Sequence, residues 1–158
     1  KTASPEFIRN TCMYYPSVQV VDDLTKYCNL GDVCKVAFYD EYDAQTHELP
    51  ELQSKLEPEL SVILSGEHWV DVMKPGVTKG GAMRGVQKKL GITPEECMAF
   101  GDYLNDCELL QSVGESYAME NAHPRLKEMA RHIAPSNDED GVMRVIRREF
   151  GLTEGGAQ

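Results

Sequence analysis

The sequence lacks the features that mark membrane proteins and nucleic-acid-binding proteins. No apolar run approaches the roughly 18 residues that a membrane-spanning helix requires. Basic residues are scarce, because 16 Lys and Arg stand against 26 Asp and Glu and leave a formal net charge of −10. Non-specific binding to nucleic acids needs a basic surface that displaces counterions from the phosphates. We therefore expect neither a nucleic-acid partner nor a membrane partner.

Cysteines at metal-binding or redox spacing are lacking as well. The five cysteines are an odd number, and no two of them form a Cys-x-x-Cys pair. That spacing disfavours both a disulfide framework and a thiolate zinc site. Reduced thiols are typical of cytosolic proteins, so we expect a cytoplasmic localisation. The four histidines do not pair at metal-ligand spacing on one helix, and we interpret them as surface or structural residues.

What is present is an ordinary globular composition with an uneven distribution of charge. The chain has 158 residues, of which 41% are hydrophobic and 27% are charged, which is enough to bury a core. Residues 1–72 carry a net charge of −8, whereas residues 73–158 carry a net charge of −2. This shift predicts two structural regions with those bounds, joined near residues 71–75.

Residues 73–158 alternate between short apolar strands and amphipathic helices. Thr78 is a predicted N-cap, and Gly91 a predicted stop, for a helix that ends at Leu90. Further strands are expected at 97–100, 117–119 and 133–134, and further helices at 108–113, after a cap at Asn121, and from Gly141 to Phe150. Strands that alternate with helices favour βαβ units, and therefore an α/β fold with a parallel sheet.

Residues 1–72 are less regular and predict an α+β unit. A helix begins at Ser4 and Pro5, and a strand and a helix follow at 33–39 and 48–56. Residues 60–64 and 68–73 predict two strands joined by a hairpin turn. Residues 18–21 allow two interpretations, a short strand or the approach to a helix that Asp22 or Asp23 caps.

Two acidic residues follow the predicted strand at 97–100. In a parallel α/β sheet, ligands bind outside the carboxyl ends of the strands, and Asp102 lies at such an end. Asp106 is four residues further on, which brings it to the same side if the segment turns helical. Carboxylates of this kind suit Mg²⁺, which takes one or two of them together with phosphate and water. The alternative is that Asp102 or Asn105 merely caps the next helix.

A lysine stands at the start of the first helix of this region. Lys79 falls in the first turn, where a cation opposes the helix dipole unless an anion also binds there. The placement therefore predicts an anion-binding residue, and the alternative is an exposed surface lysine. The surrounding glycines at 76–81 do not form a Walker A loop, because no Gly-Lys-Ser/Thr occurs.

These motifs occur in a familiar order. Lys79-Gly80 precedes the strand that leads into Gly-Asp-Tyr-Leu-Asn-Asp at 101–106, and Asn121-Ala122 and the segment 137–142 follow. The order resembles the haloacid dehalogenase superfamily, and within it the Cof-type sugar-phosphate phosphatases that carry a large inserted cap. The resemblance implies that 73–158 are the C-terminal half of a Rossmann-like core with a parallel sheet. It also implies that 1–72 are the C-terminal part of an α+β cap domain.

The resemblance also implies a role for each matched residue. Lys79 would hold the transferring phosphoryl group, and Asn105 would hydrogen-bond to the substrate phosphate. Asp102 would ligate Mg²⁺, and Asp106 would brace the metal site, either beside the ligands or through water. The implied catalytic residues are thus Lys79, Asp102 and Asp106, the cofactor is Mg²⁺, and the partner is a small phosphorylated metabolite such as a sugar phosphate.

One family motif is absent from the sequence. Family members carry a nucleophilic Asp-x-Asp after an N-terminal strand, whereas the single Asp-x-Asp here, at 138–140, follows a polar segment. We interpret it as a loop and helix cap. We therefore expect the chain to be the C-terminal part of a longer Mg²⁺-dependent phosphatase that works through an aspartyl-phosphate, and to be inactive alone. The missing N-terminal segment or a second copy of the chain would be its partner.

Two other functional classes are compatible with the same sequence. One is a non-catalytic phosphate-binding or interaction module that keeps this half of the fold. The other is an unrelated α/β domain, such as a receiver-like signalling domain, in which the motifs occur by chance. A large distance between Lys79 and Asp102 would favour that last alternative.

Overall fold

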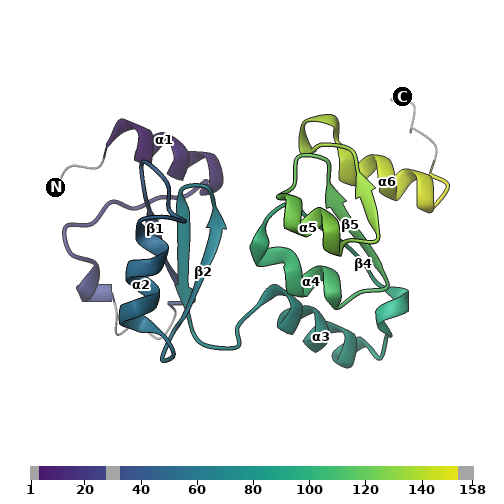
Figure 1. Ribbon diagram of the computed structural model, residues 1–158, viewed down its shortest axis with the longest axis horizontal. Coiled ribbons are helices and arrows are strands. Elements are labelled where there is room, and N and C mark those ends of the chain that lie inside the picture. Colours follow the sequence, from purple (N-terminus) through teal and green to yellow (C-terminus); the bar gives the residue numbers. More distant parts are fainter. Residues whose placement is uncertain (1–3, 28–32, 153–158) are drawn as a thin grey trace. The chain divides into compact units, whose positions relative to one another are not determined.

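The computed structural model describes residues 4–27 and 33–152 and divides the chain into two units (Figure 1). Unit 1 ends at Pro75, and unit 2 begins at Gly76. The boundary expected from charge lies between residues 72 and 73, so the difference is the short linker that follows the last strand of unit 1. Within the described residues, no helix combines the length and the apolar character needed to cross a bilayer.

Unit 1 is an antiparallel three-stranded sheet with helices packed against it. Its strand order is β1-β3-β2, and the last two strands form the predicted hairpin. Alternate residues of the outer strand β2 are buried, which is the pattern of a sheet with one covered face, whereas three consecutive residues of the central strand β3 are buried. The elements are α1 (Pro5–Tyr14), η1 (Leu24–Tyr27), β1 (Lys35–Tyr39), α2 (Glu48–Leu56), β2 (Ser61–Gly66) and β3 (Trp69–Met73).

Most expectations for unit 1 are confirmed. The hydroxyl of Ser4 accepts the N–H of Phe7 at 3.1 Å and so caps α1 at its predicted start. The interpretation of residues 18–21 as a strand is wrong, because that segment leads without pairing into the short helix η1. Asp23 accepts the N–H of Thr25 at 2.9 Å there, so the second interpretation, a cap at Asp22 or Asp23, fits the structure.

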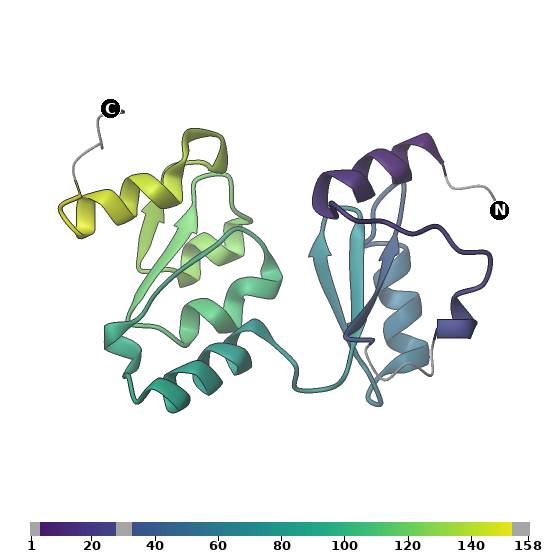
Figure 2. The ribbon, with the colours of Figure 1, turned by 180° about the vertical axis from the view of Figure 1, so that it is seen from behind.

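Unit 2 is a parallel three-stranded sheet in the order β4-β5-β6, with helices on both faces. Figure 2 shows α4 and α5 behind the sheet and α6 on its other side. The predicted α/β class is therefore confirmed for this unit. The elements are α3 (Lys79–Leu90), η2 (Pro94–Glu96), β4 (Met98–Gly101), η3 (Leu104–Asp106), α4 (Cys107–Gln111), β5 (Glu115–Met119), α5 (Pro124–Met129), β6 (His132–Ala134), η4 (Asn137–Glu139) and α6 (Gly141–Glu149).

The helix predicted after Thr78 is confirmed, and the cap predicted at Asn121 is wrong. Gly91 ends α3 in the left-handed region, with φ of 69°, as its role as a stop requires. α5 begins at Pro124, and His123 is its N-cap. The N–H of Ala122 bonds back to the carbonyl of Met119 at 2.8 Å, so Asn121 lies in a tight turn directly after β5.

The core of unit 2 brings three strand ends together at one edge. Gly101 at the end of β4 pairs with Ala118, which in turn pairs with Ile133 of β6. The ring of Tyr117 stacks on Phe100 at 5.1 Å between centroids and helps to hold the strands in this register. The loops after β4, β5 and β6 therefore leave the sheet side by side.

Candidate functional site

Asp102 stands at this edge as the first residue after β4. Its carboxylate is exposed, and Oδ2 accepts a hydrogen bond from the side-chain amide of Asn137 at 3.0 Å. Its backbone carbonyl accepts the N–H of His123 at 2.9 Å. The loop after β4 is thus tied to the loops after β5 and β6, and it presents a carboxylate where ligands of parallel sheets bind.

Asp106 is the buried centre of the same loop, with only 3% of its surface exposed. Its Oδ2 accepts the N–H groups of Asp102 at 3.1 Å and of Tyr103 at 3.5 Å. Its Oδ1 accepts from the ammonium group of Lys79. Both carboxylate oxygens are therefore engaged by the protein, and Asp106 shapes the loop rather than facing outward.

Gly101 is required by the close approach of Asp106. A Cβ at Gly101 would lie 2.6 Å from Cβ of Asp106, far inside van der Waals contact. The glycine of the Gly-Asp sequence thus allows the aspartate four residues after Asp102 to fold back beneath it. Sequence spacing predicts that the two acids share a side of the loop, and the structure adds the contact that makes it possible.

Lys79 is the first residue of α3 and joins that helix to the acidic loop. Its N-cap, Thr78, accepts the N–H of Gly81 at 3.0 Å. The side chain of Lys79 is 52% exposed, whereas that of its partner Asp106 is 5% exposed. The lysine is thus an exposed ammonium group held by a buried anchor, and its role in binding an anion stays a prediction.

The start of α3 is fixed against α4 by unusually close packing. A Cβ at Gly80 would lie 2.5 Å from the backbone oxygen of Glu108, so the two helices meet there without a side chain between them. The hydroxyl of Thr78 donates to the carboxylate of Glu108, and Arg84 lies 3.7 Å from the same oxygen. These contacts set the position from which Lys79 reaches Asp106.

Asn105 lies on η3 between the two aspartates. Its side chain is half-buried, and no hydrogen bond to it is seen from any residue that the structure describes. It therefore has both donors and an acceptor available, as a phosphate-binding amide needs. Its role in binding phosphate stays a prediction.

Three polar residues near this site were not singled out as site residues by sequence reasoning: Asn121, Asn137 and Glu108. The signal that could have found the two asparagines is their position, because each follows a short parallel strand within three residues. Glu108 gave no signal, because its contact with the start of α3 depends on how two helices pack.

Cys107 does not supply a nucleophile beside Asp106. Burial is the main cause that raises the pKa of its thiol above the usual value. A raised pKa keeps the group in its poorly nucleophilic thiol form near neutral pH.

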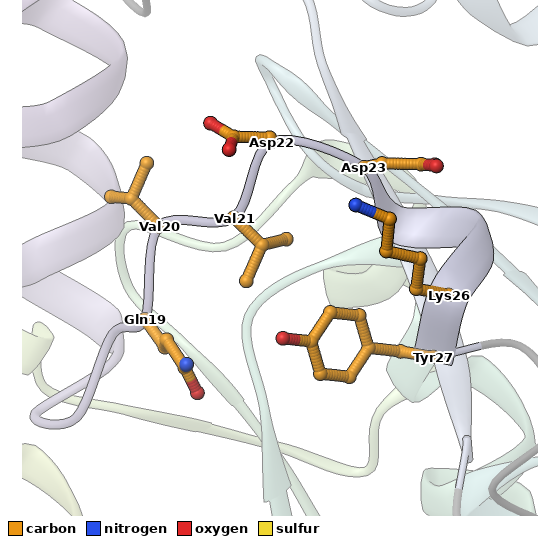
Figure 3. A pocket seen from close by; sticks show the side chains of 7 residues that line it. All are labelled: Gln19, Val20, Val21, Asp22, Asp23, Lys26 and Tyr27. Atoms are coloured by element: carbon orange, nitrogen blue, oxygen red, sulfur yellow. The ribbon is translucent and has the colours of Figure 1, made fainter.

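Unit 1 has a shallow hollow that differs in character from this site. Figure 3 shows it between the loop after α1 and η1. One ammonium group and two carboxylates line it, a balance that disfavours an anionic ligand. The lining residues are Gln19, Val20, Val21, Asp22, Asp23, Lys26 and Tyr27.

Known proteins share the stretch of sequence that contains these features. Residues 6–146 match the family described as haloacid dehalogenase-like hydrolase. The 5-amino-6-(5-phospho-D-ribitylamino)uracil phosphatase of Escherichia coli K12 is 34% identical over 138 residues, which cover 85% of this chain and 49% of that protein. The chain thus spans about half the length of this curated relative, and a similar or smaller share of several others.

Solved structures share the fold. A protein from Streptococcus mutans UA159 matches with a TM-score of 0.80 at 27% identity, over 96% of this chain and 56% of that one. A sugar phosphatase of haloacid dehalogenase subclass IIB matches with a TM-score of 0.63 at 25% identity, over 77% of this chain and 44% of that one. Because the family match includes both the lysine and the acidic loop, the resemblance drawn from the motifs is confirmed, and the chain belongs to the haloacid dehalogenase-like hydrolases.

Proposed function

We propose that this chain carries the phosphate- and metal-binding half of a Mg²⁺-dependent phosphatase that hydrolyses small phosphate esters. The observation that carries the proposal is the meeting of Lys79 with the buried Asp106 directly beneath the exposed Asp102. The start of α3 thus brings a cation to the loop that carries a candidate metal ligand at the end of a parallel strand. Phosphoryl transfer depends mainly on such positioning and charge neutralisation.

The charges of the site support a divalent cation. Lys79, Asp102 and Asp106 together carry one net negative charge, and a phosphate monoester carries about −1.5 to −2 near pH 7. Without a further cation the substrate would be repelled, whereas a divalent ion reverses the sign of the site. Mg²⁺ commonly binds one or two carboxylates and completes its shell with water and phosphate oxygens.

One of the two aspartates of the loop has a carboxylate oxygen available to ligate the metal. No described residue hydrogen-bonds to Oδ1 of Asp102, so that oxygen would hold Mg²⁺. Both carboxylate oxygens of Asp106 accept hydrogen bonds from the protein, so Asp106 would brace the site, as the resemblance implies. No group of three or more His, Cys, Asp or Glu suited to a metal occurs among the described residues, so Asp102 would share the ion with substrate and water. The bound ion would neutralise charge on the transferring group.

The remaining roles follow from the placement of each group. The ammonium of Lys79 would bind a phosphoryl oxygen while Asp106 keeps it oriented, and the amide of Asn105 would donate to the same phosphate. The aspartyl-phosphate route needs a carboxylate that attacks phosphorus and is later released by water. Asp138 and Asp140 belong to the η4 turn and its junction with α6, so the proposal assigns no nucleophile to them.

The substrate class is proposed from the relatives. One is a phosphatase of a phosphoribityl compound and another is a sugar phosphatase, so a sugar phosphate or a similar polyol phosphate is the expected substrate. We also propose that unit 1 is part of a cap domain that contributes to selectivity.

The test is hydrolysis of p-nitrophenyl phosphate and sugar phosphates by the full-length protein. We expect turnover that EDTA removes and Mg²⁺ restores, and a loss of about 100- to 1,000-fold in kcat for Asp102→Asn, of the order that removing a key electrostatic group costs. Asp138→Asn is the matched control, since it removes an exposed carboxylate from a neighbouring loop. Undiminished turnover in Asp102→Asn would disprove the site assignment. Binding of inorganic phosphate without turnover would favour the non-catalytic module.

A further inference from the structure

Three loops that follow adjacent strand ends are joined by one chain of hydrogen bonds. The side-chain amide of Asn137, after β6, donates to Oδ2 of Asp102, after β4, at 3.0 Å. Oδ1 of Asn121, after β5, accepts the backbone N–H of Asn137 at 3.1 Å. Because β4 and β6 are not neighbours in the sheet, the chain of bonds reaches across the end of β5 to connect them.

The loop that carries Asn137 is itself firmly held. Oδ1 of Asn121 also accepts the hydroxyl of Ser136 at 3.3 Å. Gly141, at the other end of the turn, is buried against Pro135, where a Cβ would lie only 1.9 Å from the carbonyl oxygen. The backbone of Asn137 is therefore fixed independently of Asp102, and its amide approaches the carboxylate from a set direction.

The carboxylate of Asp102 needs such a partner to be oriented. The backbone N–H of Asp102 is bound by Asp106 and its carbonyl by His123, so only its side-chain torsions stay free. An exposed carboxylate without a partner samples several rotamers. A neutral amide on one oxygen selects among them without cancelling the negative charge.

We propose that Asn137, held by Asn121, is a positioning residue that fixes the rotamer of Asp102 and leaves its other oxygen directed to the metal. This inference rests on the proposed function, in which Asp102 is the ligand of Mg²⁺. Partners that orient metal ligands in this way typically change metal affinity about 10- to 100-fold when they are removed. Neither asparagine touches the metal or the substrate in this role.

The first readout needs no metal. Three-bond NMR couplings that report χ1 of Asp102 are measured in the metal-free protein and in Asn137→Ala. We expect values of a single rotamer in the native protein and averaged values in the variant. Gln111→Ala, which truncates an exposed amide on α4, is the matched control and leaves the couplings unchanged. A single rotamer in both proteins would overturn the inference, whether or not Mg²⁺ binds.

The second readout is Mg²⁺ affinity, followed by the shifts of amide signals in the loop 101–106. We expect Asn137→Ala and Asn121→Ala each to weaken binding about 10- to 100-fold. If Asn121 acts through Asn137, the double variant binds no more weakly than Asn137→Ala alone, because coupled residues are not additive. Additive losses, or native affinity in Asn137→Ala, would count against the inference. If couplings change but the native protein binds no Mg²⁺, the proposed metal role fails and the positioning of Asp102 stands.

Discussion

Among the residues that the structure describes, each unit buries one aspartate and pairs it with a half-exposed lysine. In unit 1, Asp71 bonds to Lys35 at 2.8 Å, and in unit 2, Asp106 bonds to Lys79. The side chains of the two acids are 8% and 5% exposed, so the pairs are nearly equal in burial. A buried ion pair by itself therefore does not distinguish a functional site from a structural one.

The backbone around the two pairs is what differs. Asp71 lies in the middle of β3, flanked by strands on both sides. Asp106 lies after a strand end, and its second oxygen binds two backbone N–H groups of the loop that carries Asp102. The acid in unit 2 therefore organises a loop at the carboxyl end of a parallel strand, whereas the acid in unit 1 joins two strands.

Among the changes that bear on the two ion pairs, the largest effect is expected where the two helices beside Lys79 meet. Gly80→Ala places a Cβ 2.5 Å from the backbone oxygen of Glu108, so α3 must move away from α4 and carry Lys79 with it. Overpacking of this kind costs about 1–3 kcal/mol of stability. A displacement of about 1 Å at a reacting group costs about 100-fold in rate. Phosphatase kinetics and amide hydrogen exchange in unit 2 measure both effects.

The matched control for this prediction lies on the same helix. Nothing lies within 4 Å of a Cβ built at Gly85, so Gly85→Ala adds a methyl group in open space. Removing a glycine from a helix interior stabilises it by about 0.5–1 kcal/mol, and activity is expected to stay native. Native activity in Gly80→Ala would show that the helix contact does not set the position of Lys79.

The next effect separates the two acids directly. Asp106→Asn keeps one acceptor oxygen, but it buries an amide NH₂ where every described partner of the carboxylate is a donor, and it removes the counter-charge of Lys79. We expect unit 2 to lose about 1–3 kcal/mol of stability, the usual cost of an unsatisfied buried group. We also expect kcat/KM to fall about 10- to 100-fold, the size typical of residues that support a metal ligand. Equal losses from Asp71→Asn would contradict the distinction between the two pairs.

The sequence predicted unit 2 more fully than unit 1 for physical reasons. The helix after Thr78 and the strand before Asp102 carry local signals, namely a cap, a glycine stop and a short apolar run. Three of the four residues 18–21 are valines, so their composition alone suggests a strand, but the segment pairs with no described strand.

The site was predictable from the sequence where its residues lie close together along the chain. Asp102 and Asp106 are four residues apart and share a loop, and the motif that contains them predicts both. The bonds that Asn121 and Asn137 make depend on the order of three parallel strands. The contact of Glu108 with Gly80 depends on a helix crossing. Such contacts join residues that are far apart in the sequence, and no local pattern predicts them.

The smallest effect is expected from the pair in unit 1. Burial lowers the pKa of Lys35, but the hydrogen bond and charge of Asp71 and a contact with Tyr15 outweigh it and raise the net pKa above the usual 10.5. A raised pKa means that the charged lysine stabilises the fold fully below about pH 10.5, and that this stability is lost as pH rises through the folded-state pKa. Since Lys35 is 41% exposed, the contribution is discounted to less than about 1 kcal/mol.

Asp71→Asn therefore tests whether the pair in unit 1 is structural only. We expect the stability difference between the native protein and the variant, from thermal unfolding, to be below about 1 kcal/mol at pH 8 and to shrink further above pH 10.5. Taking the difference removes the titration of tyrosines common to both proteins. kcat and KM are expected to stay within about twofold of native, because the pair joins two strands of unit 1 and organises no loop of the candidate site. A loss of activity with unchanged stability would place Asp71 among the residues that serve catalysis.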